Sequence, residues 1–271
     1  MSVLVTGGTG FLGRHVLRRL LARDAAGATE VRALVRRPSR SLERLADRER
    51  PLVQVAGDVL ESATLADAMR GVTQVYHLAG FVSRRVKDAP AMMRVHVDGT
   101  RHVLEAALAA GVERVVVASS SGTIAVSDDP DFMGSDEMPH AINVVKDWPY
   151  YLSKIYQEQV AFRFFSEHKL PIVLLNPSLL LGPGDARGSS TEDVRRFLER
   201  KIPAVPKGGL NFVDVRDAAA AFVSAMHKGQ PGQRYLLGGS NWTFEKFFGR
   251  LERIAKVRAP KLRLPNNVSR W

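Results

Sequence analysis

The sequence predicts an α/β fold with a doubly wound parallel sheet and a small C-terminal lobe. Segments typical of buried strands alternate with segments of helical periodicity through the first two-thirds of the chain. This alternation is typical of a parallel sheet covered by helices on both faces. After Pro177 the pattern changes to short apolar pieces separated by proline and glycine. We therefore expect the sheet to be built first and a second, smaller unit to follow it.

The individual elements follow from apolar runs and from apolar residues at helical spacing. The expected strands are Val3–Val5, Glu30–Val35, Leu52–Val55, Val75–Leu78, Val115–Ala118, Ile172–Asn176 and Arg234–Leu237. The expected helices are Phe11–Leu21, Ser41–Asp47, Leu65–Met69, Ala91–Ala109, Tyr150–His168, Val194–Lys201, Ala218–Met226 and Phe244–Ala255. The sheet domain is expected to cover residues 1–177, with 212–228 returning to it. Residues 178–211 and 229–271 are expected to form the substrate-binding lobe.

Composition limits the class of protein. With 271 residues, 45% hydrophobic and 25% charged, the chain resembles an ordinary globular protein. It contains no apolar run long enough to cross a bilayer, and the first strand begins too close to Met1 to leave room for a cleavable signal. We expect a cytoplasmic protein with no membrane partner. The absence of cysteine excludes disulfides, thiolate metal ligands and a cysteine nucleophile.

The chain is strongly basic, with a net charge of +11 and 29 arginines among its 39 basic residues. A basic balance is typical of nucleic-acid binding, but also of a surface that attracts an anionic cofactor or substrate. The basic residues are spread along the whole chain, and no base-stacking aromatic motif accompanies them. We expect the second alternative and no nucleic-acid partner.

A glycine-rich turn lies between the first strand and the first helix. Gly7, Gly10 and Gly13 follow one another at three-residue intervals. In a dinucleotide site, glycines at such positions allow a tight turn, a close approach of backbone to pyrophosphate and close packing of helix on strand. Phe11 and Leu12 begin the helix, whose free N–H groups bind phosphate. The sequence therefore predicts a Rossmann-type dinucleotide-binding domain.

The end of the second strand indicates which dinucleotide is bound. An NAD site has an acidic residue here that binds the ribose 2′-hydroxyl. This strand ends instead in Arg36, and an arginine suits a 2′-phosphate. We expect NADP (NADPH), with NAD as the alternative if Arg36 is only a solvated loop charge. After the third strand, Asp58 and Val59 are expected beside the adenine, although a helix-capping turn explains Asp58 equally well.

Three residue types point to proton-transfer chemistry. Tyr150 and Lys154 lie four residues apart on a predicted helix, so both project from one face. A lysine ammonium near a phenol favours the phenolate, and we expect it to lower the tyrosine pKa. The serine run 119–121 ends a strand at the edge where open α/β sheets bind ligands. The histidines lack the spacing of a metal site, so we expect no metal.

These motifs together resemble the extended short-chain dehydrogenase/reductases, and within them the dihydroflavonol-reductase-like branch. The matching segments are 6–13, 76–80, Gly99–Thr100, the serine run, Tyr150 to Lys154, 176–178, 182–185 and 211–217. The resemblance implies a hydride passed between a nicotinamide and a substrate carbon. It implies that Tyr150 is the general acid/base and that Lys154 adjusts the tyrosine pKa and binds the cofactor ribose. It also implies that Ser120 positions the substrate oxygen, with Ser121 as the alternative.

The resemblance also implies further cofactor contacts and two departures. Leu78, Ala79 and Gly80 are expected under the cofactor, and Pro177 and Ser178 beside the nicotinamide. Relatives usually carry asparagine where His96 stands. They usually continue beyond residue 271 with further helices, so the lobe is expected either to be incomplete through truncation or to be genuinely short. Relatives are often homodimers through a four-helix interface, although core packing explains the apolar stripes of the two long helices equally well.

We expect an NADP(H)-dependent oxidoreductase that reduces a ketone or aldehyde. The alternatives are a nucleotide-sugar epimerase or dehydratase with bound NAD, and a cofactor-sensing binding protein without turnover. Arg36 and the Asn176–Pro177–Ser178 sequence favour the reductase, since sugar-nucleotide enzymes commonly carry Asn-Val-Tyr-Gly-Pro at the latter position. The substrate, a carbonyl compound or a sugar, is expected between segments 126–148 and 184–210. Arg195 and Arg196 are expected on a solvated helix face rather than at an anionic substrate.

Overall fold

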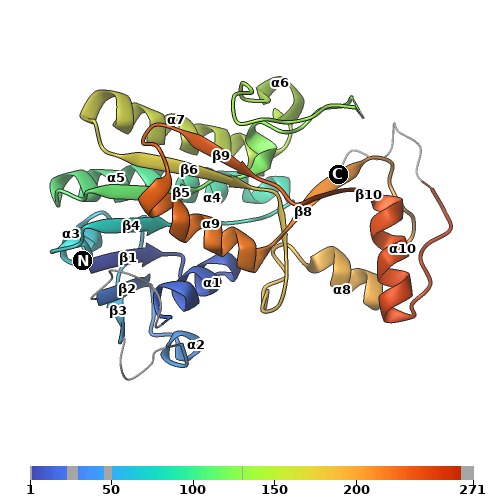
Figure 1. The fold of residues 1–271 in the computed structure, drawn as a ribbon, viewed down its shortest axis with the longest axis horizontal. Helices are drawn as coiled ribbons and strands as arrows, with labels where there is room; N and C mark the ends of the chain where they lie inside the picture. Colours follow the sequence, from blue (N-terminus) through green and yellow to red (C-terminus); the bar gives the residue numbers. More distant parts are fainter. Residues whose placement is uncertain (1, 23–29, 46–50, 130, 264–271) are drawn as a thin grey trace.

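The computed structural model describes residues 2–22, 30–45, 51–129 and 131–263, and its centre is a seven-stranded parallel sheet (Figure 1). The strand order is β3-β2-β1-β4-β5-β6-β9, the doubly wound arrangement of a Rossmann fold. The predicted fold class is thereby confirmed. The strands are β1 (Ser2–Thr6), β2 (Glu30–Val35), β3 (Leu52–Ala56), β4 (Gln74–His77), β5 (Arg114–Ala118), β6 (Ile172–Pro177) and β9 (Arg234–Leu237).

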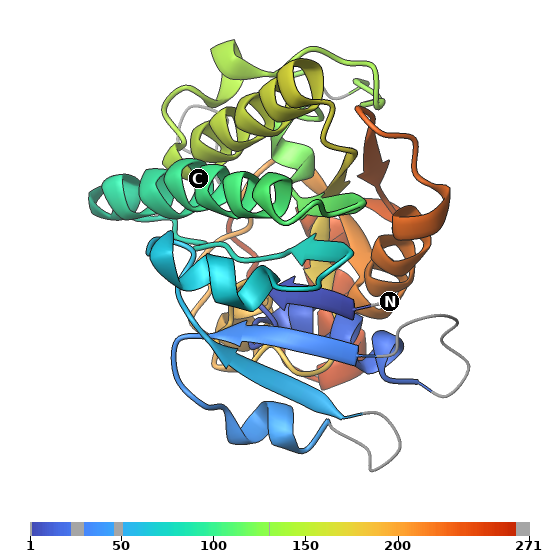
Figure 2. The same cartoon turned by 90° about the vertical axis from the view of Figure 1, so that its left-hand side faces the viewer.

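Helices cover both faces of the sheet, which explains why its strands read as continuous apolar runs. On one face, α1 (Phe11–Leu20) packs against α9 (Val215–Lys228). On the other face lie α3 (Ala63–Met69), α5 (Gly99–Ala109) and α7 (Pro149–His168), and Figure 2 shows α5 and α7 side by side. A short helix, α2 (Arg40–Glu43), follows β2. Residues 46 and 47, the end of the expected Ser41–Asp47 helix, lie outside the described residues.

The expected helix Ala91–Ala109 is interrupted. It consists of α4 (Ala89–Met93), a π-helical turn (Arg94–Asp98) and α5. A π-turn adds a residue to the helical repeat and re-aims the side chains that follow. The turn contains His96, which is fully buried and hydrogen-bonded to α7. Apolar periodicity alone did not predict this interruption, because the spacing of apolar residues does not distinguish a single π-turn from an α-helical turn.

A second unit follows the sheet domain at one end of the molecule (Figure 1). It contains a three-stranded sheet of order β10-β8-β7, formed by β10 (Ser240–Thr243), β8 (Gly209–Asp214) and β7 (Leu179–Leu181). Helices α8 (Glu192–Leu198) and α10 (Phe244–Ala255) cover it. Its core is aromatic, and the Phe212 and Phe247 rings stack with centroids 4.6 Å apart. The remaining short helix, α6 (Ile142–Val145), precedes α7.

The structure differs from the expected division of the chain at one segment. Residues 234–237, expected in the lobe, form β9 and pair with β6 in the seven-stranded sheet. The reason is a parallel crossover through α9, which returns the chain to the sheet edge next to β6. α9 itself packs into the core beneath the sheet, together with α1.

The edge strand β9 is covered by the segment that precedes α6. The Leu236 N–H donates to the Asp136 carboxylate, and the Arg234 guanidinium donates to the Asp136 and Met138 carbonyl oxygens. Two residues of α1 likewise hold the entry to the lobe, since Arg14 and His15 bond the Gly184 and Pro183 carbonyl oxygens. Among the helices of the described residues, none combines the length and the apolar character that a membrane span requires.

Candidate active site

The glycine-rich turn packs against the segment that follows β4. Gly7 has a φ of +71°, and a Cβ at this residue would lie 2.5 Å from the Leu78 carbonyl carbon. A Cβ at Gly13 would lie 2.2 Å from the Gly7 carbonyl oxygen. Both contacts exclude any larger side chain, so the glycines are required for this close packing of strand, turn and helix.

The start of α1 suits a pyrophosphate. Gly10 precedes the helix and provides no side-chain cap, and the first turn contains no acidic residue. The first N–H groups of a helix have no partner within it, and the helix dipole favours an anion at this position. Phe11 and Leu12 belong to this first turn. The residues present therefore fit a bound dinucleotide.

The segment after β4 continues the same edge toward α7. The N–H groups of Leu78 and Ala79 donate to the Thr6 carbonyl and hydroxyl oxygens, each at 3.2 Å. A Cβ at Gly80 would lie 3.7 Å from the Lys154 Nζ. Residues 78–80 thus connect the glycine turn with the lysine of α7, and the structure brings these predicted cofactor residues together.

Two predicted cofactor residues follow β2 and β3. Arg36 is exposed directly after β2, and no carboxylate in the described part of the chain pairs with it. Asp58 accepts the Leu60 N–H at 3.0 Å, while its own N–H donates to the Thr64 hydroxyl. Asp58 thus forms a local turn but caps no helix, since Ser62 is the residue that precedes α3. Val59 is buried and would touch a Cβ at Gly99.

The predicted catalytic residues converge where β5 ends and α7 begins. Ser120 is the second residue after β5, and its hydroxyl accepts the Gly122 N–H at 3.3 Å. Burial raises the pKa of Tyr150, the adjacent Tyr151 raises it further, and a hydrogen bond with Ser120 acts in the opposite direction. The Tyr150 ring also meets the His96 ring edge to face, with centroids 5.7 Å apart. Of the two candidate serines, the structure brings Ser120 to Tyr150.

Lys154 is almost completely buried. Its Nζ donates to the Ala118 carbonyl oxygen at 2.9 Å and to the Gln157 side-chain oxygen at 2.8 Å. Burial lowers the pKa of Lys154 to about 7, partly offset by the negative charge of Glu158. The sequence expectation that Lys154 lowers the pKa of Tyr150 is therefore wrong for this structure, because the ammonium is directed to other acceptors and desolvation dominates both groups.

Sequence reasoning did not find a buried polar network that supports Lys154. His77 contacts the Thr6 and Thr100 hydroxyls, both at 2.8 Å, and Gln157 donates to the same Thr100 hydroxyl. Burial and the charge of Lys154 lower the pKa of His77 to about 3, so the imidazole is neutral. The position of Gln157, three residues after Lys154, was the available signal, since such a residue shares a helix face with the lysine.

His96 connects three parts of the site. The Phe81 N–H donates to Nε2 at 3.1 Å, so the proton of the neutral imidazole lies on Nδ1. Nδ1 then donates to the Ser153 hydroxyl at 2.8 Å, and this hydroxyl donates to the Tyr150 carbonyl oxygen at 2.7 Å. Burial lowers the pKa of His96, as does the charge of Lys154. His96 therefore holds the first turn of α7.

The remaining expected residues surround this edge. Pro177, the last residue of β6, is buried, and the Ser178 N–H donates to the Leu237 carbonyl oxygen at 2.9 Å. Trp148, in one expected substrate wall, packs against Tyr151 with ring centroids 5.5 Å apart. Arg195 pairs with Glu192 and Glu199 along the exposed side of α8. Within the described residues, no three His, Asp or Glu side chains are grouped as a metal site would require.

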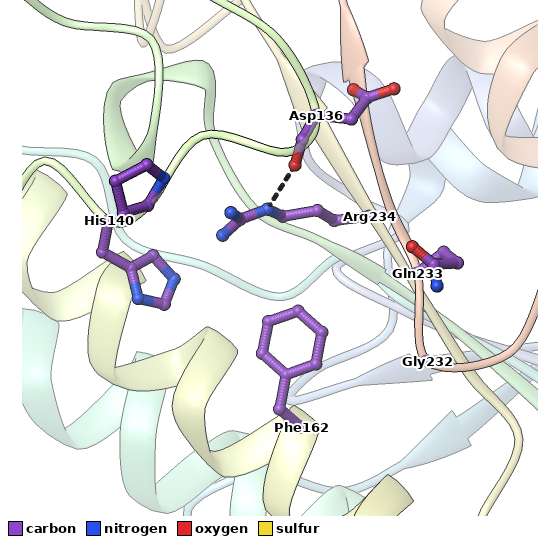
Figure 3. Close-up of a pocket in the computed structure, with 7 residues that line it drawn as sticks. Asp136, His140, Phe162, Gly232, Gln233 and Arg234 are labelled. Carbon is purple, nitrogen blue, oxygen red and sulfur yellow. Dashed lines mark hydrogen bonds between the residues drawn. The ribbon is translucent and has the colours of Figure 1, made fainter.

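A separate pocket lies at the opposite end of α7, near the beginning of β9 (Figure 3). Its lining includes His140, Phe162 and Arg234. Arg234 begins β9, whereas Tyr150 and Ser120 lie at the carboxyl edge of the sheet. This pocket is therefore not the cofactor crevice.

The sequence profile of the NAD dependent epimerase/dehydratase family matches residues 3–238. The chain belongs to this family. It is 37% identical over 274 residues to a putative dihydroflavonol 4-reductase of Synechocystis sp., covering 98% of this chain and 75% of the relative. It is 33% identical over 276 residues to sterol demethylase protein B of Methylococcus capsulatus, covering 98% and 78% of the two chains.

Solved structures give the same assignment. DesIV, a dTDP-glucose 4,6-dehydratase from Streptomyces venezuelae with NAD and TYD bound, aligns with a TM-score of 0.82 and 26% identity over 95% of this chain and 82% of its own. The predicted membership of the extended short-chain dehydrogenase/reductases is confirmed. The protein is an NAD(P)-dependent enzyme of this type, and its relatives include reductases, dehydratases and epimerases.

Proposed function

We propose that this family member is an NADP(H)-dependent reductase that converts a ketone or aldehyde into an alcohol. The observation that carries the proposal is the convergence of Tyr150, Ser120 and Lys154 beside the glycine turn and residues 78–80. The 37% identity to a putative dihydroflavonol 4-reductase supports the same reaction class.

The reaction needs a hydride and a proton, and the chain provides the proton. When bound, the reduced nicotinamide supplies hydride to the carbonyl carbon. Tyr150 Oη donates its proton to the carbonyl oxygen, and Ser120 Oγ holds that oxygen by a hydrogen bond. Because burial raises the pKa of Tyr150, the phenol stays protonated near neutral pH. A reduction requires this protonated form.

Lys154 orients the cofactor in this proposal. An ammonium has three N–H donors, and two of them are used by Ala118 and Gln157. The third is available to a ribose hydroxyl, because Gly80, the residue beside the Nζ, has no side chain that would fill this space. Leu78 and Ala79 form the floor under the cofactor, and Pro177 and Ser178 line the nicotinamide end.

The choice of NADP rests on Arg36. Its guanidinium is exposed at the end of β2, where a ribose 2′-phosphate would lie. A guanidinium binds phosphate through paired charge-assisted hydrogen bonds. No acidic residue follows β2 directly to hold a 2′-hydroxyl instead.

A nucleotide-sugar epimerase or dehydratase is the second candidate. It is favoured by the likeness to DesIV, whose structure contains NAD and TYD. Such an enzyme keeps its NAD bound and returns it to the starting state within each turnover, so it consumes no free cofactor.

One experiment separates these candidates from each other and from a cofactor-sensing binding protein. The protein is incubated with NADPH or NADH and a panel of ketones, aldehydes and nucleotide sugars, while reduced nicotinamide is followed by absorbance and products are analysed for stereochemistry. We expect substrate-dependent oxidation of NADPH by a ketone or aldehyde. Sugar conversion without net NADPH oxidation would replace the reductase with the epimerase or dehydratase. Cofactor binding without any turnover would support the binding protein.

A further inference from the structure

A buried carboxylate lies beneath the proposed catalytic residues. Tyr150, Lys154 and Glu158 follow one another at four-residue intervals on α7, so all three belong to one face of the helix. Glu158 lies about 12 Å from Tyr150 along the helix axis. Its side chain is 0% exposed. A charge in such a place is retained only when its oxygens are fully hydrogen-bonded or paired.

One oxygen of Glu158 faces the end of β5. Oε1 accepts hydrogen bonds from the Ser119 hydroxyl, from the Thr123 hydroxyl at 2.7 Å and from Asn176 Nδ2 at 2.7 Å. These three donors come from the turn after β5 and from β6. The carboxylate therefore links α7 to both strands that carry the site.

Two of these donors also hold the backbone of Ser120. Asn176 Nδ2 donates to the Ser120 carbonyl oxygen at 3.1 Å, and the Thr123 hydroxyl, which lies 2.9 Å from the same oxygen, shares its one proton between that oxygen and Glu158. Ser119, which precedes Ser120, is held directly by Glu158. The peptide units on both sides of the serine are thus fixed by groups that converge on one carboxylate.

The other oxygen of Glu158 faces two basic groups. Oε2 lies 2.9 Å from His140 Nε2 and 3.3 Å from the Arg234 guanidinium. Figure 3 shows His140 and Arg234 at the pocket near the beginning of β9. Arg234 also donates to the carbonyl oxygens of Asp136 and Met138. The charge of Glu158 is therefore balanced from the side away from Ser120.

From this arrangement we propose that Glu158 is a positioning residue for the reaction: through Thr123, Asn176 and Ser119 its carboxylate fixes the turn that presents Ser120 to Tyr150. The inference rests on the proposed function and adds a residue that never touches substrate or cofactor. Glu158 has a second effect on the site, because its charge opposes the lowering of the Lys154 pKa by burial. The other titratable groups that face Lys154 are His77 and His96.

The first test is Glu158→Gln, with Glu167→Gln as the matched control on the exposed side of α7. A glutamine carries no charge and has only one accepting oxygen, so it cannot accept from the donors at the Ser120 turn and from Arg234 together, and the turn is held less firmly. We expect kcat to fall on the order of 100-fold, because small displacements of reacting groups have such effects. At a pH where Lys154 is protonated in both proteins, the cofactor dissociation constant is expected to stay within about twofold of the parent. Equal kcat values in Glu158→Gln and Glu167→Gln would overturn the proposal.

The pH profile separates positioning from a general loss of structure. Without the negative charge of Glu158, the pKa of Lys154 falls further, so activity that depends on the protonated lysine is lost at lower pH than in the parent. A Glu158→Gln profile that is reduced in height but unshifted on its alkaline side would contradict this second effect.

A second pair of variants applies if Glu158→Gln does not fold. Thr123→Val keeps the shape of the side chain and removes the hydroxyl between Glu158 and Ser120, whereas Thr123→Ser keeps the hydroxyl. We expect a large loss of kcat for valine and retention for serine. Equal activity of these two variants would contradict the proposed link.

A measurement without turnover distinguishes this inference from the proposed function. NMR of carbon-13-labelled tyrosine at neutral pH reports the surroundings of the Tyr150 phenol, on whose pKa Ser120 acts. If Glu158 positions Ser120, the ring signal of Tyr150 moves in Glu158→Gln and stays unchanged in Glu167→Gln, even if no carbonyl substrate is reduced. An unchanged Tyr150 signal in Glu158→Gln overturns the positioning role alone.

Discussion

Arg84 and Asp193 join the sheet domain to the lobe. Two nitrogens of the Arg84 guanidinium donate to the two carboxylate oxygens of Asp193, at 3.0 and 2.7 Å. Arg84 follows β4, whereas Asp193 lies in α8. The charge of Arg84 also acts on Tyr151, the neighbour of Tyr150. This ion pair therefore connects the two units close to the proposed substrate site.

We predict that Arg84→Ala raises KM for the carbonyl substrate more than it lowers stability. The arginine side chain is 59% exposed, and an exposed ion pair contributes at most about 1 kcal/mol to folding. Steady-state kinetics and urea unfolding measure the two effects. Arg195→Ala is the control, because Arg195 pairs only along α8. Equal KM values for the two variants would show that the connection has no part in substrate binding.

Tyr150→Phe is expected to reduce kcat by about 10²–10⁴-fold, the range for loss of a general acid. Cofactor affinity should remain near that of the parent, because the ring is kept. Tyr156→Phe, on the same helix with a 39% exposed side chain, is the control and should leave kcat unchanged. Turnover of Tyr150→Phe close to that of the parent would remove the proton-donor role.

Arg36→Asp is expected to weaken NADPH binding and to leave NADH binding nearly unchanged. The new carboxylate repels a 2′-phosphate and accepts a 2′-hydroxyl. Dissociation constants from nicotinamide fluorescence measure both cofactors. Arg163→Asp changes the net charge equally on the exposed side of α7 and controls for long-range attraction. An equal loss of NADPH affinity in the two variants would assign the preference to overall charge.

The lowered pKa of Lys154 predicts how the stability of the protein depends on pH. Its pKa is lowered in the folded protein from 10.5 to about 7. Between these values the unfolded chain binds the proton that the folded chain lacks, so the free energy of unfolding rises with pH through this window. The slope is at most about 1.4 kcal/mol per pH unit. Urea unfolding of Lys154→Met should lack this rise, whereas Lys146→Met, an exposed control, should keep it. Parallel curves for the parent and Lys154→Met would contradict the lowered pKa.

Gly13→Ala is expected to destabilise the fold and to weaken cofactor binding together. A Cβ at Gly13 would lie 2.2 Å from the Gly7 carbonyl oxygen, and overpacking of this kind typically costs about 1–3 kcal/mol. Gly249→Ala in α10 is the matched control, since its Cβ would meet no atom within 4 Å in the described structure. Helix propensity makes the control more stable by up to about 1 kcal/mol. Thermal unfolding and cofactor titration measure the stability and the cofactor affinity of both variants. A Gly13→Ala protein as stable as the parent would be evidence against the close packing.

The sequence predicted the sheet domain well because its signals are local. The apolar run Val115–Ala118 predicts a buried strand, and the glycines at 7, 10 and 13 predict the turn before the first helix. The strand Leu179–Leu181 was not predicted, because three residues are too short to show a period. The π-turn around His96 was not predicted either, since apolar spacing does not reveal it, and the contact of His96 with α7 is visible only in the fold.

The proposed site likewise contains residues that the sequence indicated and residues that only the fold brings together. The spacing of Tyr150 and Lys154 is visible in one helix, whereas the partners of Glu158 come from residues as distant as Arg234. No pattern along the chain indicates that His140 and Arg234 meet one carboxylate. The direction of the Lys154 pKa also required the fold, because burial rather than proximity to Tyr150 determines it.

The cover over β9 bears on self-association. The outer strand of a sheet exposes backbone groups to which a strand of another molecule can add, and such addition leads to aggregates. The Leu236 N–H, to which an incoming strand would have to bond, already donates to the Asp136 carboxylate. Growth of the sheet by further chains is thereby blocked at Leu236. The stretch that provides this block continues to Trp148, so resistance to aggregation and the surroundings of Tyr151 depend on one piece of chain.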